Sequence, residues 1–149
     1  MRTHPSGTSA VVAVCISVIL VACGSRLPAG FDSLTLTEKV AAYETHLGSY
    51  GRPSTRAEKS IAKHGVEAAL AMLPYVRGDR VGGLTAQEAL VIIDLVQSSG
   101  HNLRGTIVEY EIERFLARST LTIGEQAAAK GALESIRSAG AVQGGGRSR

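Results

Sequence analysis

The sequence predicts an all-α protein, an irregular bundle of about five or six helices. Two observations support this fold class. The pattern Thr-x-x-Glu recurs along the chain, and each copy opens a stretch whose apolar residues are spaced three and four apart. Aromatic residues make up only 4% of the chain and Trp is absent, so the core must be aliphatic and Ala-rich, which suits helices. The four copies of the pattern are Thr35–Glu38, Thr55–Glu58, Thr85–Glu88 and Thr122–Glu125.

The Thr-x-x-Glu pattern is the capping box of a helix start. The Thr hydroxyl accepts from a free N–H of the first turn, and the Glu three residues later reaches back to the Thr N–H. A carboxylate also suits the positive end of the helix dipole. A fifth copy, Thr106–Glu109, fits as well, but it could lie inside a helix that starts near Asn102.

Three helices are expected in the first half. Residues 35–47 should form a helix that ends at Gly48, and residues 55–64 one that ends at Gly65, because glycine often follows the last helical residue. Residues 66–77 should form the third, with Pro74 kinking or shortening it. We expect its buried face to comprise Val66, Ala69, Leu70, Leu73 and Val76.

Three more helices are expected in the second half. Residues 85–98 are apolar nearly all round through Leu90–Val96 and should form the central, most buried helix. The alternative for that run is a buried strand, since it is rich in β-branched residues. Residues 103–118 should bury Val108, Ile112, Phe115 and Leu116, and the Ala-rich residues 122–138 should close the domain.

The N-terminus has the organisation of a secretory signal. A short polar segment with Arg2 is followed by 13 apolar residues, 10–22. A membrane-spanning helix needs about 20 such residues, so this run has the length of a signal-peptide core. If it is removed, Cys15 is lost and Cys23 is the single mature thiol, which excludes an internal disulfide and a cysteine-based zinc cluster.

Leu20, Val21, Ala22 and Cys23 resemble the lipobox of bacterial lipoproteins. The resemblance covers residues 1–25 and implies cleavage before Cys23, with a covalent diacylglycerol and an N-acyl lipid on that residue and no other cofactor. The resemblance thus implies the lipid bilayer as a partner of the chain. Two or three acyl chains would anchor the protein to it stably. The alternatives are an ordinary cleaved signal and an uncleaved N-terminal anchor. Gly24 is not the Asp that retains such proteins at the inner membrane, so the periplasmic face of the outer membrane is favoured, with the inner membrane as the alternative.

These features divide the chain into four parts. Residues 1–22 are the expected signal peptide, 23–33 a lipidated tether, 34–139 a helical domain and 140–149 a disordered tail of Gly, Ser and Arg. Residues 55–77 resemble the antiparallel helix pairs of HEAT-like repeats, in which a first helix ends at Gly and a second carries Leu at helical spacing. The resemblance implies helix pairs that bind proteins.

No catalytic or metal-binding pattern emerges from the sequence. His46, His64 and His101 have no partner at i,i+4 spacing, so we expect surface histidines and no metal site. Ser60 and Lys63 have the Ser-x-x-Lys spacing, but nothing else of a serine hydrolase accompanies them. Glu109, Glu111 and Glu113 are expected on a charged, solvated helix face compensated by Arg114 and Arg118.

The most unusual loop spans residues 77–83. It contains Gly78, Asp79, Arg80, Gly82 and Gly83 but lacks the Gly-Lys-Ser/Thr that holds a phosphate. We expect a flexible connector with a solvated ion pair, and we take these five residues as the candidate interaction loop.

The functional expectation follows from the anchor and the fold class. The net charge of +3 gives no electrostatic case for nucleic-acid binding. We expect a small, non-enzymatic envelope lipoprotein whose helices contact a protein partner, as an adaptor or assembly factor. The alternative is an envelope hydrolase or a small-ligand-binding lipoprotein with a pocket between helices.

Overall fold

The computed structural model describes residues 27–80 and 82–139. The expected signal peptide, the lipobox with Cys23, and the C-terminal tail lie outside the described residues. Within them the chain forms a short 3-10 helix and six α-helices, and no strand. Their bounds are η1 Phe31–Ser33, α1 Leu36–Tyr50, α2 Thr55–Ala62, α3 Val66–Arg77, α4 Ala86–Ser98, α5 Ile107–Leu116 and α6 Ile123–Ser138.

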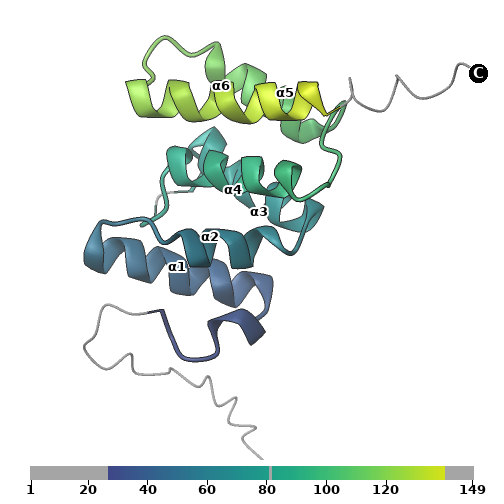
Figure 1. Ribbon diagram of the computed structural model, residues 1–149. Coiled ribbons are helices and arrows are strands. Elements are labelled where there is room, and N and C mark those ends of the chain that lie inside the picture. Colours follow the sequence, from purple (N-terminus) through teal and green to yellow (C-terminus); the bar gives the residue numbers. More distant parts are fainter. Residues whose placement is uncertain (1–26, 81, 140–149) are drawn as a thin grey trace, which may run out of the picture.

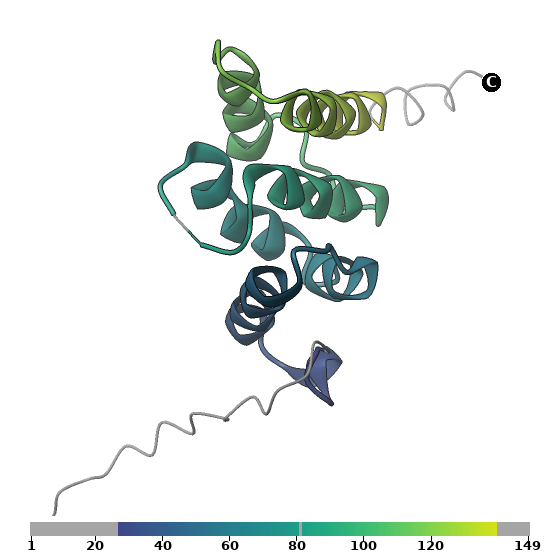
Figure 2. The same ribbon diagram turned by 90° about the vertical axis from the view of Figure 1, so that its left-hand side faces the viewer.

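The six helices stack in two layers. Helices α1, α3 and α5 form one layer and α2, α4 and α6 the other, so that consecutive helices alternate between layers (Figures 1 and 2). Helix α4 lies in the middle and packs against α2, α3 and α6. This arrangement confirms the all-α fold class. Among helices that follow one another in the sequence, α3 and α4 pack most extensively, whereas α2 and α3, the segment with the HEAT-like pattern, contact each other little.

The central helix is the one expected from its apolar run. Leu90, Ile92, Ile93 and Val96 of α4 are fully buried. Four other helices contribute Ile61, Met72, Ile112 and Ile136, one each from α2, α3, α5 and α6, so a single aliphatic core runs through the stack. The strand alternative for this segment is therefore wrong.

Three of the capping boxes form as predicted and one does not. Thr35, Thr85 and Thr122 each accept from the backbone N–H of the Glu three residues on, and that Glu side chain binds the Thr N–H. At α2 the cap is Ser54 instead of Thr55. The residue three positions after Ser54 is Ala57, so no box can close there. Glu58 is buried instead and accepts a 2.8 Å hydrogen bond from the Tyr43 hydroxyl.

Two helix boundaries differ from the prediction by three residues or more. Helix α1 continues through Gly48 to Tyr50, and Gly51 caps it with a left-handed φ of 58°. Helix α5 begins at Ile107 and not near residue 103, because Thr106 is its cap and Glu109 reaches back to the N–H of Gly105. The fifth Thr-x-x-Glu copy therefore marks a helix start.

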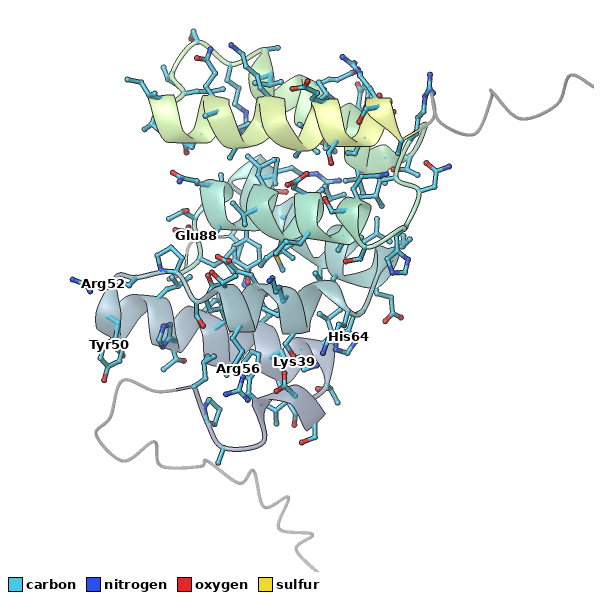
Figure 3. All side chains as sticks on the ribbon, in the orientation of Figure 1. Lys39, Tyr50, Arg52, Arg56, His64 and Glu88 are labelled. Carbon is cyan, nitrogen blue, oxygen red and sulfur yellow. The ribbon has the colours of Figure 1, made fainter. Side chains whose placement is uncertain are left out.

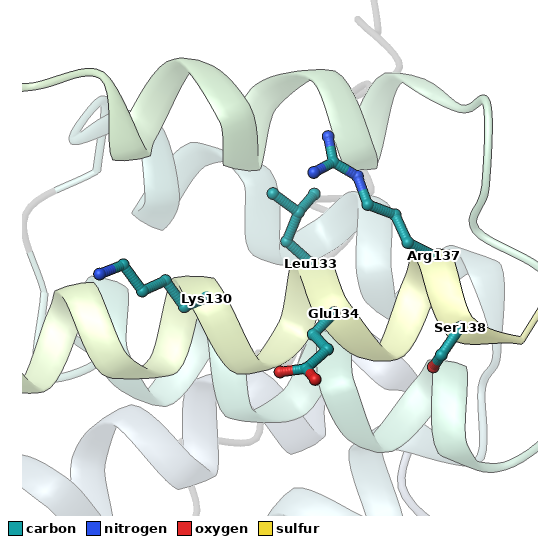
Figure 4. Close-up of a pocket in the computed structure, with 5 residues that line it drawn as sticks. All are labelled: Lys130, Leu133, Glu134, Arg137 and Ser138. Atoms are coloured by element: carbon teal, nitrogen blue, oxygen red, sulfur yellow. The ribbon is translucent and has the colours of Figure 1, made fainter.

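The two ends of the stack are closed differently. At the α1 end, Phe31 of η1 is fully buried and Leu27 and Leu34 pack on the core. The packed structure thus includes residues that we assigned to the tether. At the α6 end, the outer helix surface carries Lys130, Glu134 and Arg137 (Figure 4). In the part of the chain that is described, no helix is long and apolar enough to cross a membrane.

Candidate functional site

Helix α3 buries a different surface from the one expected. Ala69, Leu73 and Val76 are buried as predicted, but Val66 is 42% and Leu70 44% exposed. The reason is that α3 packs against both α4 and α5, so its buried surface turns toward Ala68, Met72 and Tyr75. Two large apolar side chains are thereby left on the outside of the α3 layer.

Helix α5 presents a matching pair of exposed apolar side chains. Ile107 is 47% and Tyr110 is 54% exposed, on the first turn of the helix. Val66 and Leu70 likewise occupy the first turns of α3, and the two helices pack side by side. We call these four residues the α3–α5 face: Val66, Leu70, Ile107 and Tyr110.

Contacts at both ends show that α3 and α5 run in the same direction. At their N-terminal ends, the ring of His101 packs against Gly65, so closely that a Cβ there would lie 2.7 Å from His101 Cε1. At their C-terminal ends, Arg118 donates to the carbonyls of Val76 and Arg77, at 3.2 and 2.8 Å. The first turns of the two helices therefore lie at the same end of the layer.

A buried carboxylate joins the outer surfaces of α3 and α5. Glu111 lies 3.4 Å from Arg77 Nε of α3 and 3.5 Å from Arg114 Nη1 of its own helix. The Arg114 guanidinium also lies 5.8 Å from the ring centre of Tyr110. Arg77 and Arg114 thus reach one carboxylate from the exposed stripes of both helices, which places those stripes on the same side of the molecule. Two arginines against one glutamate leave the edge of the α3–α5 face positively charged.

The three glutamates of α5 are not a solvated row. Glu111 is buried between the arginines, while Glu109 and Glu113 both pair with Arg137 of α6. Hydrogen bonds from the Gly105 N–H and from Arg137 hold the pKa of Glu109 below its ordinary value. Arg118, which we expected to compensate these charges, caps α3 instead. The three carboxylates fasten α5 to its neighbours on both sides.

The candidate interaction loop is fastened to α1. Arg80 lies 3.5 Å from Glu44 Oε2, and its guanidinium lies 5.4 Å from the ring centre of Tyr75. The Tyr75 hydroxyl donates a 2.9 Å hydrogen bond to Glu44, and burial with this carboxylate raises the pKa of Tyr75 to about 12. The ion pair expected in the loop is therefore made with α1.

Glycine is required at each of three loop positions for a different structural reason. Gly78 has a φ of 82° and terminates α3. A Cβ on Gly82 would collide with the Glu44 carboxylate, and one on Gly83 with the Glu44 backbone carbonyl. Asp79 is exposed, and its N–H donates to Pro74 O. The loop glycines thus allow the chain to cross close over α1, and its role in binding stays a prediction.

None of the three histidines is a free surface residue. His46 lies in a stacked row with Tyr43 and Tyr50. His64 Nε2 is 3.0 Å from Nζ of Lys39, a pair visible in Figure 3. In the described ranges no three His, Cys, Asp or Glu side chains gather as a metal ion would require.

The surface of the described residues also has open depressions, of which two bear on the candidate residues. One, of about 520 Å³, is lined by a single helix, α6, through Lys130, Leu133, Glu134, Arg137 and Ser138 (Figure 4). The other, of about 460 Å³, lies between η1 and α2 and is lined by Asp32, Thr55, Arg56, Lys59, Ser60 and Lys63. Ser60 and Lys63, singled out for their spacing, thus line one depression, but Ser60 is buried and Lys63 exposed.

Comparison with known proteins gives no relative: the chain matches no protein family, no curated protein and no solved structure.

Proposed function

We propose that this protein is a non-enzymatic envelope lipoprotein, anchored through Cys23, whose α3–α5 face binds a protein partner as an adaptor or assembly factor. The observation that carries the proposal is the exposure of Val66, Leu70, Ile107 and Tyr110 on the first turns of two parallel, adjacent helices. Exposed apolar side chains that gather on one surface favour a binding site over chance exposure. Aromatic and aliphatic anchors of this kind dominate the energy of protein interfaces.

The chemistry of the partner follows from the charges beside the face. Arg77 and Arg114 share the single carboxylate of Glu111, so the edge has an excess of positive charge. Arg114 also covers one side of the Tyr110 ring. A partner segment with two or three apolar side chains next to acidic residues would complement this surface in shape and in charge. Opposite charge at the rim would mainly speed association and set orientation.

The membrane anchor supports the same function. Cleavage before Cys23 would leave Cys23, Gly24, Ser25 and Arg26 ahead of Leu27, which already packs on the core. The helix stack would then be held close to the bilayer, where an envelope partner would meet it. We favour the periplasmic face of the outer membrane because Gly24 follows the cysteine.

The hydrolase or small-ligand alternative requires converging polar side chains in an enclosed pocket. Both depressions described above are open to solvent, and the one on α6 draws all its residues from one helix. Neither of these two depressions has that enclosed form.

Site-specific crosslinking in cells tests the proposal. A photoreactive amino acid is placed at Leu70, at Tyr110 and, as a control, at the exposed Gln126 of α6. We expect Leu70 and Tyr110 to crosslink the same envelope protein, and Gln126 not to do so. Crosslinks to a second copy of this chain, or equal yields at all three positions, would contradict the adaptor function.

The identified protein is then purified and its affinity measured with matched variants. Leu70→Asp should weaken binding about 30-fold, the loss typical of an interface anchor. Ile123→Asp makes the same kind of change at a 90% exposed residue away from the face and should leave the affinity unchanged. Equal losses for the two variants would sink the assignment of the face.

A further inference from the structure

Three cations line up on the outer side of α2. Arg56, Lys59 and Lys63 are spaced three and four apart, so they share one side of the helix, and all three are exposed. They line the depression between η1 and α2, and Arg56 points from α2 toward η1 in Figure 3. We call these three residues the α2 basic face.

The α2 basic face has little compensating charge. Arg56 pairs with Asp32 of η1 at 2.9 Å. Every ion pair in the described part of the chain involves an arginine, so Lys59 and Lys63 have no such partner there. The opposite end of the stack is mixed in sign, since the outer side of α6 carries Lys130 and Arg137 with Glu134.

The α2 basic face lies at the end of the molecule where the chain enters. The described chain begins at Leu27, below α1 in Figure 1, and continues through η1 along the base of the stack. Four peptide units separate Cys23 from Leu27. Fully extended, they span about 14 Å. An acyl chain on Cys23 would therefore hold the η1–α2 end, and not the α6 end, against the bilayer.

We propose that the α2 basic face binds the anionic phospholipid headgroups of the membrane in which the protein is anchored. This inference rests on the lipid anchor of the proposed function and adds an orientation to it. With η1 and α2 turned to the bilayer, the unpaired ammonium groups of Lys59 and Lys63 lie at the phosphate level. The stack then stands on its α1–α2 end, and the α3–α5 face, farther along the stack, stays open to a partner.

The physical case is electrostatic. A cation near a negatively charged membrane surface is attracted enough to change an equilibrium about fivefold. The attraction decays over about 8 Å at physiological ionic strength. The tether is short enough to hold the cations of α2 within this distance of the membrane surface. The tether removes the cost of bringing the protein to the surface, so a few cations suffice to set its orientation.

The test uses the mature lipoprotein reconstituted in vesicles of phosphatidylcholine, with or without phosphatidylglycerol. A fluorophore is attached to one of two introduced cysteines: Thr55→Cys, at a position that lines the depression, or Gln126→Cys on α6. Its quenching by a spin label on the lipid headgroups reports how close each position lies to the membrane surface. We expect stronger quenching at residue 55 than at 126, only when phosphatidylglycerol is present, and loss of that difference at high salt. Equal quenching at the two positions, or quenching that ignores lipid charge, overturns the proposal.

A pair of charge variants provides the matched control. Lys59→Gln with Lys63→Gln should reduce the oriented population about fivefold for each cation removed. Lys130→Gln with Arg104→Gln removes the same charge from exposed residues elsewhere and should leave the quenching unchanged. Equal effects of both pairs would contradict the assignment to α2. The intact mass of each sample reports acylation separately, so failure of the anchor is distinguished from failure of the orientation.

Discussion

The buried Lys39 of α1 and the half-buried His64, just beyond the end of α2, form a pair in which the lysine Nζ lies 3.0 Å from the imidazole Nε2. The same ammonium donates to Ser60 O at 3.4 Å, while the backbone N–H of His64 donates to Ile61 O. The positive charge of Lys39 therefore lies at the C-terminal end of α2, where it interacts favourably with the helix dipole. The pair also ties α1 to α2.

Replacing Lys39 with Met should destabilise the fold. The methionine keeps the apolar stem but removes the donors to Ser60 O and His64 Nε2, and buried acceptors left without donors cost about 1–3 kcal/mol. Lys59→Met, at an exposed position on α2, should change stability by less than about 0.5 kcal/mol. Urea unfolding followed by circular dichroism measures both. A Lys39→Met protein as stable as wild type would show that the pair does not contribute to the free energy of unfolding.

The central helix gives a prediction with a closely matched control. Ile93→Asp places a carboxylate in a fully buried aliphatic site and should prevent cooperative folding, because no partner offsets its desolvation. Ile123→Asp makes the identical substitution at a residue that is 90% exposed on the first turn of α6. That variant should fold normally, since an acidic group suits a helix N-terminus. Helical circular dichroism and a thermal transition should be lost only in Ile93→Asp.

Two glycines near Glu44 should respond to alanine with opposite signs. Gly83→Ala should destabilise because the added Cβ meets the Glu44 carbonyl, which is backbone and cannot swing away. Gly48→Ala, inside α1 with open space around it, should stabilise by about 0.5–1 kcal/mol because alanine favours the helix. Thermal unfolding of the two variants measures the signs. Equal shifts would mean that the loop does not pack on α1 as described.

The sequence predicted what is local in this fold. Capping at Thr35, Thr85 and Thr122 depends on residues three positions apart, so it can be found by inspection. The apolar run in α4 likewise predicts a buried helix, because a helix that is apolar on all sides must lie in the centre of the fold. The start of α5 was misjudged because nothing in the local pattern excludes a longer helix.

The contacts that define the candidate surfaces could not be predicted from local sequence patterns. Tyr75 with Glu44, Lys39 with His64, and Arg77 with Glu111 join residues 25 to 34 positions apart on different helices. The hydrogen bond between Tyr43 and Glu58 likewise joins two helices and could not be predicted from the Thr-x-x-Glu spacing. The exposure of Val66 and Leu70 depends on which neighbours α3 acquires, and their spacing alone suggests burial. Candidate sites on helix surfaces therefore needed the tertiary packing.

Acid should weaken the attachment of α5 to α6 through Glu109. Its pKa is lowered in the folded protein by the Gly105 N–H and by Arg137, so its stabilisation is present above the ordinary value of 4.5 and is lost as pH falls through the folded pKa. Glu109→Gln removes this titration. The difference in unfolding free energy between wild type and Glu109→Gln should therefore shrink below about pH 4.5. Urea denaturation at several pH values measures it, and a constant difference would contradict the role of the carboxylate.

The anchor is tested by the two cysteines, which serve as each other's control. Cys23 is the last residue of the pattern that resembles a lipobox, whereas Cys15 lies within the apolar run that precedes it. In a bacterial host, the membrane fraction of wild type and of Cys15→Ser should contain a chain that begins at residue 23 and carries added acyl mass. Cys23→Ser removes the thiol that accepts the diacylglycerol, so the precursor should remain uncut before residue 23. Intact-mass spectrometry distinguishes these products. A wild-type chain that begins at Cys23 without acyl mass would refute lipidation, and the orientation inferred for α2 would lose the tether on which it depends.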